Sequence, residues 1–288
     1  GETESFSASA SQRTTRTSTV RVGSEVSFNE TLPETNAGLY ASSWTCSPTG
    51  DEKTSGTTTD AFAVTGEGLA CTFTNAPKSA KVVVSKVWEN AFAGDVTTVA
   101  ANSASQSHTA TGGNEGPVEV VRTTAIVGTS VSVSEALAPA NTGLYDTTYT
   151  CVQGGTTVAT GNSTVIPGFV VTSPDTLECE FTNTAKTVDV TLVKEWVDAT
   201  AGDTAELVIE GAEPVTSTAP QGSIVDTVNV VTAPVRIGDS VTMSEALDAV
   251  SGASYGTTFS CDVEGTSTTA NGALSYDVLV GTEELVCT

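Results

Sequence analysis

The chain has 288 residues, and its 34 acidic and 11 basic side chains give a formal net charge of −23 and a pI near 4.1. This charge excludes nucleic-acid backbones and anionic membrane surfaces as expected partners, because both would repel it. Charged residues make up only 16% of the chain, and the many Thr, Ser, Gly, Ala and Val residues indicate a β-rich protein and not a helical or disordered one.

The sequence carries no recognisable targeting or anchoring signal. It has no signal peptide, no cell-wall sorting signal and no start methionine, and no apolar run reaches the roughly 20 residues that span a bilayer. We therefore expect a segment of a longer protein, with no membrane insertion in this segment.

Three cysteine pairs recur along the chain. Their second members follow one another at intervals of 108 residues, the size of one small β-sandwich domain. Spacings of 25, 28 and 26 residues within the pairs, without any Cys-x-x-Cys and with a single histidine, His108, fit no zinc site. We predict three disulfides, each within one repeat, and hence an oxidising, extracellular setting: Cys46 with Cys71, Cys151 with Cys179, and Cys261 with Cys287.

Two further sequence blocks set the order of the repeats. A block containing Lys-x-Trp occurs at 82–88 and 190–196, and a block ending in Glu-x-Leu occurs three times, at 22–32, 127–137 and 237–247. The resulting boundaries are a partial repeat at 1–79 without its first block, a complete repeat at 80–185, and a partial repeat at 186–288 without its final Phe-Thr-Asn.

Each block alternates apolar and polar residues with period two. Turn residues such as 93–95 and 201–203, both Ala-Gly-Asp, separate the blocks, and no helix of useful length is evident. This pattern is typical of half-buried antiparallel strands. We predict an all-β fold, a tandem array of Ig-like antiparallel β-sandwich domains.

Three polar residues of the complete repeat stand in otherwise apolar strand columns. Side chains on a strand alternate faces, so this parity directs Lys86, Glu135 and Asn183 into the core. A buried charge or amide is costly unless it is paired, so these three residues are expected to meet one another. The same parity gives two partial sets in the other repeats: Glu30 with Asn75, and Lys194 with Glu245.

Such a set can react. Burial lowers the pKa of a lysine and raises that of a glutamate, which favours a neutral amine beside a protonated carboxyl. The Lys86 amine can then attack the Asn183 carbonyl while Glu135 shuttles protons to the departing ammonia, leaving a permanent amide cross-link. The alternative is a hydrogen-bonded polar cluster that fixes strand register without reacting.

The motifs 86–88 (Lys-Val-Trp), 131–135 (Val-Ser-Val-Ser-Glu) and 181–183 (Phe-Thr-Asn) resemble, in this order, the collagen-adhesin B-type or prealbumin-like repeats of Gram-positive surface adhesins and pilins. The resemblance covers each repeat. It implies a prealbumin-like sandwich and a Lys to Asn isopeptide bond, with Lys86, Glu135 and Asn183 in the reacting roles. For Glu30 with Asn75, and for Lys194 with Glu245, it implies missing members that lie outside the chain.

Several other residues receive structural interpretations. His108 is a single imidazole without a fixed acid or nucleophile partner, so it is assigned no role. Asp95 and Asp203 are expected to shape turns, with calcium binding as the weaker alternative. Two matches to the glycosylation acceptor, at 29–31 and 162–164, are attributed to chance. The aromatic residues that share the cysteine parity are expected to pack against the disulfides: Trp44, Tyr149 and Phe259.

These features predict a structural protein without enzymatic activity or cofactors. The expected function is a repeat segment of an extracellular bacterial surface fibre, stalk or pilus-like filament, whose partners are neighbouring repeats or copies of the same protein. The alternative is an adhesin that binds a host or environmental ligand through sandwich loops such as 152–168. The sequence contains no phosphate loop, zinc-helix motif or catalytic triad that would indicate an enzyme.

Overall fold

The computed structural model describes residues 4–5, 7–9, 13–48, 51–53, 56–248, 250–263, 266–272 and 274–288. Strands make up nearly all of the regular structure, and the one helix in this part of the chain, α1 (Glu34–Ala37), has four residues. The predicted all-β fold is confirmed. No described helix is long and apolar enough to cross a membrane.

The chain divides into two compact units. The first comprises residues 1–80 with 125–129 and 170–174, and the second comprises 81–124, 130–169 and 175–288. The division into three repeats that the sequence suggests stays a prediction.

The first unit contains two small sheets, with strand orders β3-β2-β5 and β1-β4. Its core is built around Trp44, Cys46 and Phe62. Among the described residues β5 pairs only with β2, so its second edge carries no strand. The strands are β1 (Glu25–Val26), β2 (Tyr40–Ser47), β3 (Glu52–Lys53), β4 (Phe62–Ala63) and β5 (Ala70–Pro77).

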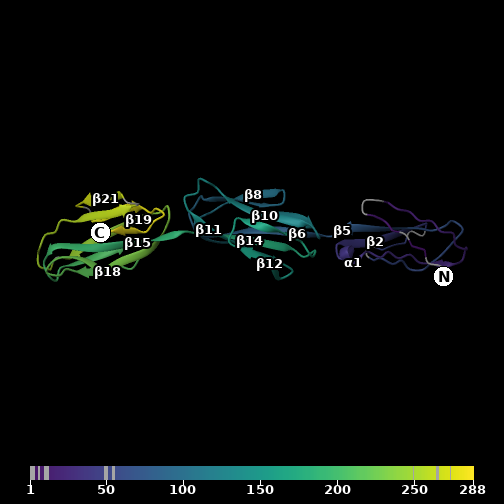
Figure 1. Ribbon diagram of the computed structural model, residues 1–288, viewed down its shortest axis with the longest axis horizontal. Coiled ribbons are helices and arrows are strands. Elements are labelled where there is room, and N and C mark those ends of the chain that lie inside the picture. The colour runs from purple at the N-terminus through teal and green to yellow at the C-terminus, as the bar shows by residue number, and fades with distance from the viewer. Residues whose placement is uncertain are drawn as a thin grey trace. The chain divides into compact units, whose positions relative to one another are not determined.

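The second unit begins with two sheets that we call the β6 sandwich. One sheet has the order β12-β11-β14-β6-β9 and the other β13-β10-β7-β8, and the two layers are visible in Figure 1. Their strands are β6 (Ser79–Ala91), β7 (Val96–Ala101), β8 (Ala104–Thr109), β9 (Gly113–Ile126), β10 (Ser130–Leu137), β11 (Tyr145–Gln153), β12 (Thr156–Gly161), β13 (Val165–Val170) and β14 (Leu177–Ala185).

Two further sheets form what we call the β15 sandwich. Their orders are β18-β15-β23-β20-β21 and β17-β16-β19-β22, and apolar residues from both sheets share one core. The strands are β15 (Thr187–Ala199), β16 (Thr204–Ile209), β17 (Val215–Thr218), β18 (Gly222–Arg236), β19 (Ser240–Asp248), β20 (Thr258–Val263), β21 (Thr266–Asn271), β22 (Ser275–Leu279) and β23 (Leu285–Cys287).

Parallel pairing of the first and last strands positions the polar set of the β6 sandwich. β14 runs parallel to β6 over eight residue pairs, from Leu177 opposite Val82 to Thr184 opposite Glu89, and Phe181 faces Lys86. In the β15 sandwich the corresponding pairing ends where Cys287 faces Leu192. Lys194 and the residues after it therefore have no described ladder partner on that side of β15.

The structure forms the three disulfides that the sequence predicts, and the part of the chain that it describes contains no free cysteine. Each bond joins cysteines that face each other on neighbouring antiparallel strands. The three aromatic residues two positions before the first cysteines are buried beside them: Trp44, Tyr149 and Phe259. Each disulfide thus lies within the apolar core, as parity predicts.

Removal of a disulfide should destabilise its own sandwich. We expect the double substitution Cys151→Ala/Cys179→Ala to lower the free energy of unfolding by about 3 kcal/mol, because an open chain gains loop entropy when unfolded. Thermal or urea unfolding of the oxidised proteins measures this loss. Cys261→Ala/Cys287→Ala is the matched variant, and an unchanged transition in the affected sandwich for either variant would contradict the prediction.

Candidate functional site

Lys86 lies at the centre of the candidate site and is fully buried. It stands on β6 in the same inward column as Trp88, whose ring centroid is 4.3 Å from the lysine Nζ. The ammonium donates to the carbonyl oxygens of Val87 at 2.7 Å and Phe181 at 3.5 Å. Both contacts use backbone acceptors of β6 and β14, so the parallel strand pair itself holds the amine in place.

Burial lowers the pKa of Lys86 to about 8, and the nearby charge of Glu135 offsets part of this effect. With a pKa of about 8, roughly a tenth of the amine is neutral at pH 7, far more than for an ordinary lysine. The lysine is therefore a usable nucleophile near neutral pH.

Glu135 reaches the lysine from the opposite sheet. It stands on β10, and its Oε1 lies 3.4 Å from Lys86 Nζ. The same oxygen accepts hydrogen bonds from Asn183 Nδ2 at 3.1 Å and Thr97 Oγ1 at 2.9 Å. Lys86, Glu135 and Asn183, which the sequence places in three separate strands, are thus brought together in the core.

Two oxygens of this cluster remain without a hydrogen-bond partner among the described residues. They are Glu135 Oε2 and Asn183 Oδ1, and both are buried. Two buried acceptors without a donor are costly, and a proton on one of them would provide the missing donor. One additional proton shared between these two oxygens would therefore give both of them a hydrogen bond.

The partial sets also form, but with different geometry. In the β15 sandwich, Lys194 Nζ lies 2.6 Å from Glu245 Oε1, and 4.7 Å from the ring centroid of Trp196. In the first unit, Asn75 Nδ2 donates to Glu30 Oε1 at 2.6 Å. Each pair thus lacks one member of the triad among the described residues.

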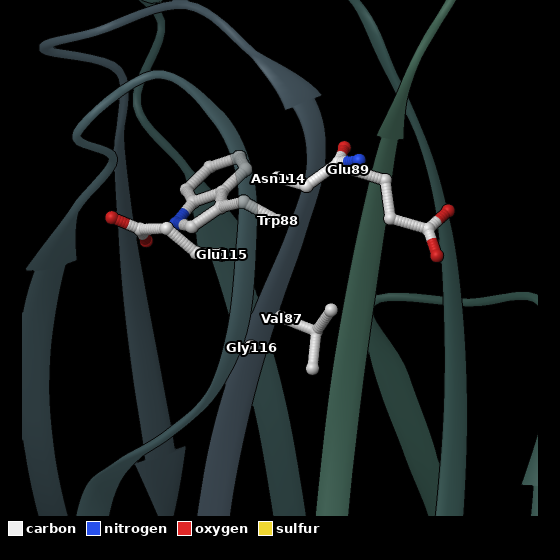
Figure 2. A pocket seen from close by; sticks show the side chains of 6 residues that line it. All are labelled: Val87, Trp88, Glu89, Asn114, Glu115 and Gly116. Atoms are coloured by element: carbon white, nitrogen blue, oxygen red, sulfur yellow. The ribbon is translucent and has the colours of Figure 1, made fainter.

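The indole of Trp88 borders a surface hollow that is also lined by Val87, Glu89, Asn114, Glu115 and Gly116. In Figure 2 the indole nitrogen lies on the side of Glu115, whereas Glu89 points away from it. Trp88 Nε1 is buried and has no described partner.

The equivalent indole of the β15 sandwich is satisfied. Trp196 Nε1 donates to Ser217 Oγ at 3.0 Å, and Ser217 donates in turn to Asp226 at 2.6 Å. His108 occupies the ladder position that corresponds to Ser217, and its Nε2 lies 3.0 Å from Glu115 Oε2. His108 thus has a carboxylate partner that the sequence did not reveal.

Asp95 and Asp203 act as buried anchors for the loops that lead into β11 and β20. Asp95 accepts from the backbone of Thr142 at 2.7 Å and of Gly143 at 3.0 Å, and from the Tyr145 hydroxyl at 2.7 Å. These donors satisfy the hydrogen-bonding needs of the buried carboxylate within the protein. The described residues contain no group of three or more metal-ligating side chains.

Asp203 repeats this arrangement with a hydroxyl in place of one backbone donor. It accepts from the backbone and hydroxyl of Ser251 at 2.9 Å and 2.6 Å and from the Tyr255 hydroxyl at 2.7 Å. The hydrogen bonds from Ser251, and then that from Tyr255, hold the pKa of Asp203 below its usual value.

The two tyrosines and Thr97 were not predicted to belong to these clusters. Signals were nevertheless present: Ala-Gly-Asp recurs at 93–95 and 201–203, and a tyrosine stands six residues before the first cysteine of every repeat. For Thr97 the signal was parity, since it shares an inward column with Val99 and Ala101.

Comparison with known proteins supports the fold. A family model described as a prealbumin-like fold domain matches residues 2–77 and 82–185. A comparison with curated proteins finds no match. Similar solved structures include the T-13 major pilin of Streptococcus pyogenes, at 12% identity and a TM-score of 0.31, covering 73% of this chain and 96% of the pilin.

Two other solved structures show similar values. A C-terminal fragment of the pilus adhesin SpaC from Lactobacillus rhamnosus GG has 13% identity and a TM-score of 0.29, with 72% of this chain and 96% of the fragment covered. The Bacillus anthracis TIE protein has 12% identity and a TM-score of 0.31; 91% of this chain is covered, but the match spans only 51% of the TIE protein. Because these TM-scores are low, the assignment to a family depends on the family model and not on the solved structures.

The Asp95 anchor should contribute measurably to stability. Tyr145→Phe removes a donor from a buried carboxylate, and we expect the free energy of unfolding at pH 7 to fall by about 2 kcal/mol. Burial, and then the hydrogen bond to Asp95, raise the pKa of Tyr145 to about 12. The raised pKa stabilises the fold below about pH 10, and this contribution is lost as the pH rises toward 12, so the deficit of the variant should shrink over that range.

Urea unfolding from pH 7 to 11.5 measures this dependence. Tyr149→Phe, which removes a hydroxyl further along β11, is the control. A Tyr145→Phe deficit that stays constant over the whole pH range would contradict the assignment.

Proposed function

Because the chain belongs to the family of prealbumin-like fold domains, we propose that it is a structural segment of an extracellular fibre on the surface of a Gram-positive bacterium. The observation that carries this proposal is the convergence of Lys86, Glu135 and Asn183 in the core. Three disulfides and the repeated sandwiches agree with a secreted, load-resisting role.

The chemistry proposed for the triad is a single intramolecular amide exchange. The neutral Lys86 amine attacks Asn183 Cγ, a new C–N bond forms, and the bond from Cγ to the Asn183 nitrogen breaks. One lysine hydrogen passes to the departing nitrogen, which leaves as ammonia. Each triad reacts once and is consumed, so the reaction is a maturation step and not an enzymatic activity.

Glu135 is suited to both proton transfers. Its Oε1 is within 3.4 Å of the attacking nitrogen and 3.1 Å of the departing one, so a proton can move from the first to the second through this oxygen. A proton on Oε2 would supply the donor that Asn183 Oδ1 lacks and would polarise the carbonyl for attack. In this scheme Oε1 transfers the proton between the two nitrogens, and Oε2 donates a hydrogen bond to the carbonyl oxygen.

The position of the bond explains its mechanical value. Lys86 lies near the start of the β6 sandwich and Asn183 near its end, on parallel neighbouring strands. A covalent link between them would carry tension directly from one strand to the other. With the disulfide between Cys151 and Cys179 closed, the chain between them could otherwise extend by roughly 200 Å at about 3.3 Å per residue, and the bond would keep it folded under load.

Loss of one ammonia tests the proposed bond. We expect the intact mass of the oxidised wild-type protein to be one ammonia below its disulfide-corrected sequence mass, and Glu135→Ala to restore the full mass. Lys86→Met should likewise keep the ammonia, whereas Glu180→Ala, on the outward face of β14, should lose it. A wild type with the full mass would show that the triad is only a polar cluster.

We also propose that the partial sets, at 1–79 and 186–288, are completed by a strand from an adjoining repeat or a neighbouring copy. Among the described strands β5 has one edge without a neighbour, and β15 has no described ladder partner beyond Leu192 on the side of β23. Such edges readily accept an extended segment through backbone hydrogen bonds. A segment that extended β23 in the same register would place an inward residue opposite Trp196. An asparagine there would correspond to Asn183, which faces Trp88 in the β6 sandwich.

A synthetic peptide with the sequence of residues 181–188 should fill this position. We expect it to add covalently to the full chain with loss of one ammonia, because its asparagine would lie beside Lys194 and Glu245. Mass spectrometry after denaturation detects the adduct. The Asn183→Ala peptide and the Lys194→Met chain are the matched controls, and an adduct formed with either control would refute pairing at this edge.

A further inference from the structure

Thr97 is a buried polar residue that the proposed chemistry has not used. It stands on β7, facing Leu137 in the ladder with β10, and its side chain is completely shielded from solvent. Its hydroxyl donates to Glu135 Oε1 at 2.9 Å and is 3.3 Å from the carbonyl oxygen of Ala136. Thr97 thus hydrogen-bonds to the proton-shuttling carboxyl, and neither of its described hydrogen bonds is to Lys86 or Asn183.

The β15 sandwich provides a natural comparison. There Ala205 faces Leu247 in the equivalent ladder, so it occupies the position of Thr97 but has no hydroxyl. Glu245, the counterpart of Glu135, therefore receives no donor from this strand position. Its Oε1 lies 2.6 Å from Lys194 Nζ, whereas the corresponding distance from Glu135 to Lys86 is 3.4 Å.

This difference matters for reactivity. In the β15 sandwich the Glu245 carboxyl lies against the Lys194 nitrogen at 2.6 Å, and the two groups must separate before this nitrogen can attack a carbonyl. In the β6 sandwich the neutral donors Thr97 and Asn183 occupy Oε1, and the closest acceptor of the lysine is instead the Val87 carbonyl at 2.7 Å. The Lys86 amine can therefore pass a proton to Glu135 Oε1, 3.4 Å away, without first separating from a contact as close as that of Lys194 with Glu245.

The hydroxyl also distinguishes the two oxygens of Glu135. Because Thr97 donates to Oε1, this oxygen is kept as an acceptor, and a proton on the carboxyl is directed to Oε2. Oε2 is buried and has no hydrogen-bond partner in the part of the chain that the structure describes, and the same is true of Asn183 Oδ1. When the carboxylate forms during proton transfer, the Thr97 hydrogen bond to it becomes charge-assisted and stronger.

We infer that Thr97 is a positioning residue for cross-link formation, which orients the Glu135 carboxyl and keeps it from closing onto Lys86 as tightly as Glu245 closes onto Lys194. The inference rests on the proposed cross-linking function and adds a residue outside the triad. We therefore expect the cross-link to form faster in the β6 sandwich than in the β15 sandwich. Because Ala205 has no hydroxyl, this difference should persist even when an asparagine is placed beside Lys194.

The rate of ammonia loss tests this role. The full chain is made by cell-free synthesis under oxidising conditions, and its intact mass is followed over time after synthesis. Thr97→Val keeps the side-chain shape and removes the hydroxyl, so we expect the reaction to slow by about tenfold, the effect of losing one hydrogen bond to a charged group. Thr97→Ser should restore the rate to within about threefold of the wild type.

Thr98→Val, which changes an exposed neighbour on the same strand, is the control and should react at the wild-type rate. Near-UV circular dichroism of each variant establishes that it is folded, and rescue by serine separates the hydroxyl from a packing effect. Equal rates for the wild type and Thr97→Val, or a Thr97→Ser protein as slow as Thr97→Val, would overturn the role of Thr97 alone. A folded wild type that never loses ammonia would overturn the cross-link and, with it, this inference.

Discussion

Parallel pairing of β6 with β14 is the constraint on which the rest of the site depends. It brings the first and last strands of one sandwich side by side and sets Phe181 opposite Lys86. Only with this register do Lys86 and Asn183 enter the same buried space, where Glu135 reaches them from the other sheet. The disulfide between Cys151 and Cys179 joins the last strand to its other neighbour, so β14 is held on both sides.

The three polar sets show what each member contributes. Without a described lysine, Glu30 and Asn75 form a short hydrogen bond in the first unit. Without a described asparagine, Lys194 and Glu245 form a close ion pair. The complete set is different from both, because Asn183 and Thr97 occupy the carboxyl oxygen and the lysine is held by backbone carbonyls. The arrangement proposed to react is therefore a property of the whole cluster.

Much of this architecture could be predicted from the sequence, because strands have a strict period of two. Parity alone directed Lys86, Glu135 and Asn183 inward, and the recurrence of the cysteines gave their pairing. Contacts between residues of unrelated sequence position were not predictable. The bonds from Tyr145 to Asp95 and from His108 to Glu115 depend on how loops and edge strands fold over the sheets, which no periodicity encodes.

The strand register has a consequence for quality control during folding. A slip of β14 by one residue would turn Asn183 away from the core and present Thr182 or Thr184 in its place, and neither side chain has a carbonyl that an amine can attack. A misregistered sandwich would thus lack the cross-link, and its reversible opening would leave it exposed to proteases. A correctly registered one would become permanent. Because only the native register allows the bond to form, the covalent step would selectively and permanently stabilise those sandwiches that have reached their native alignment.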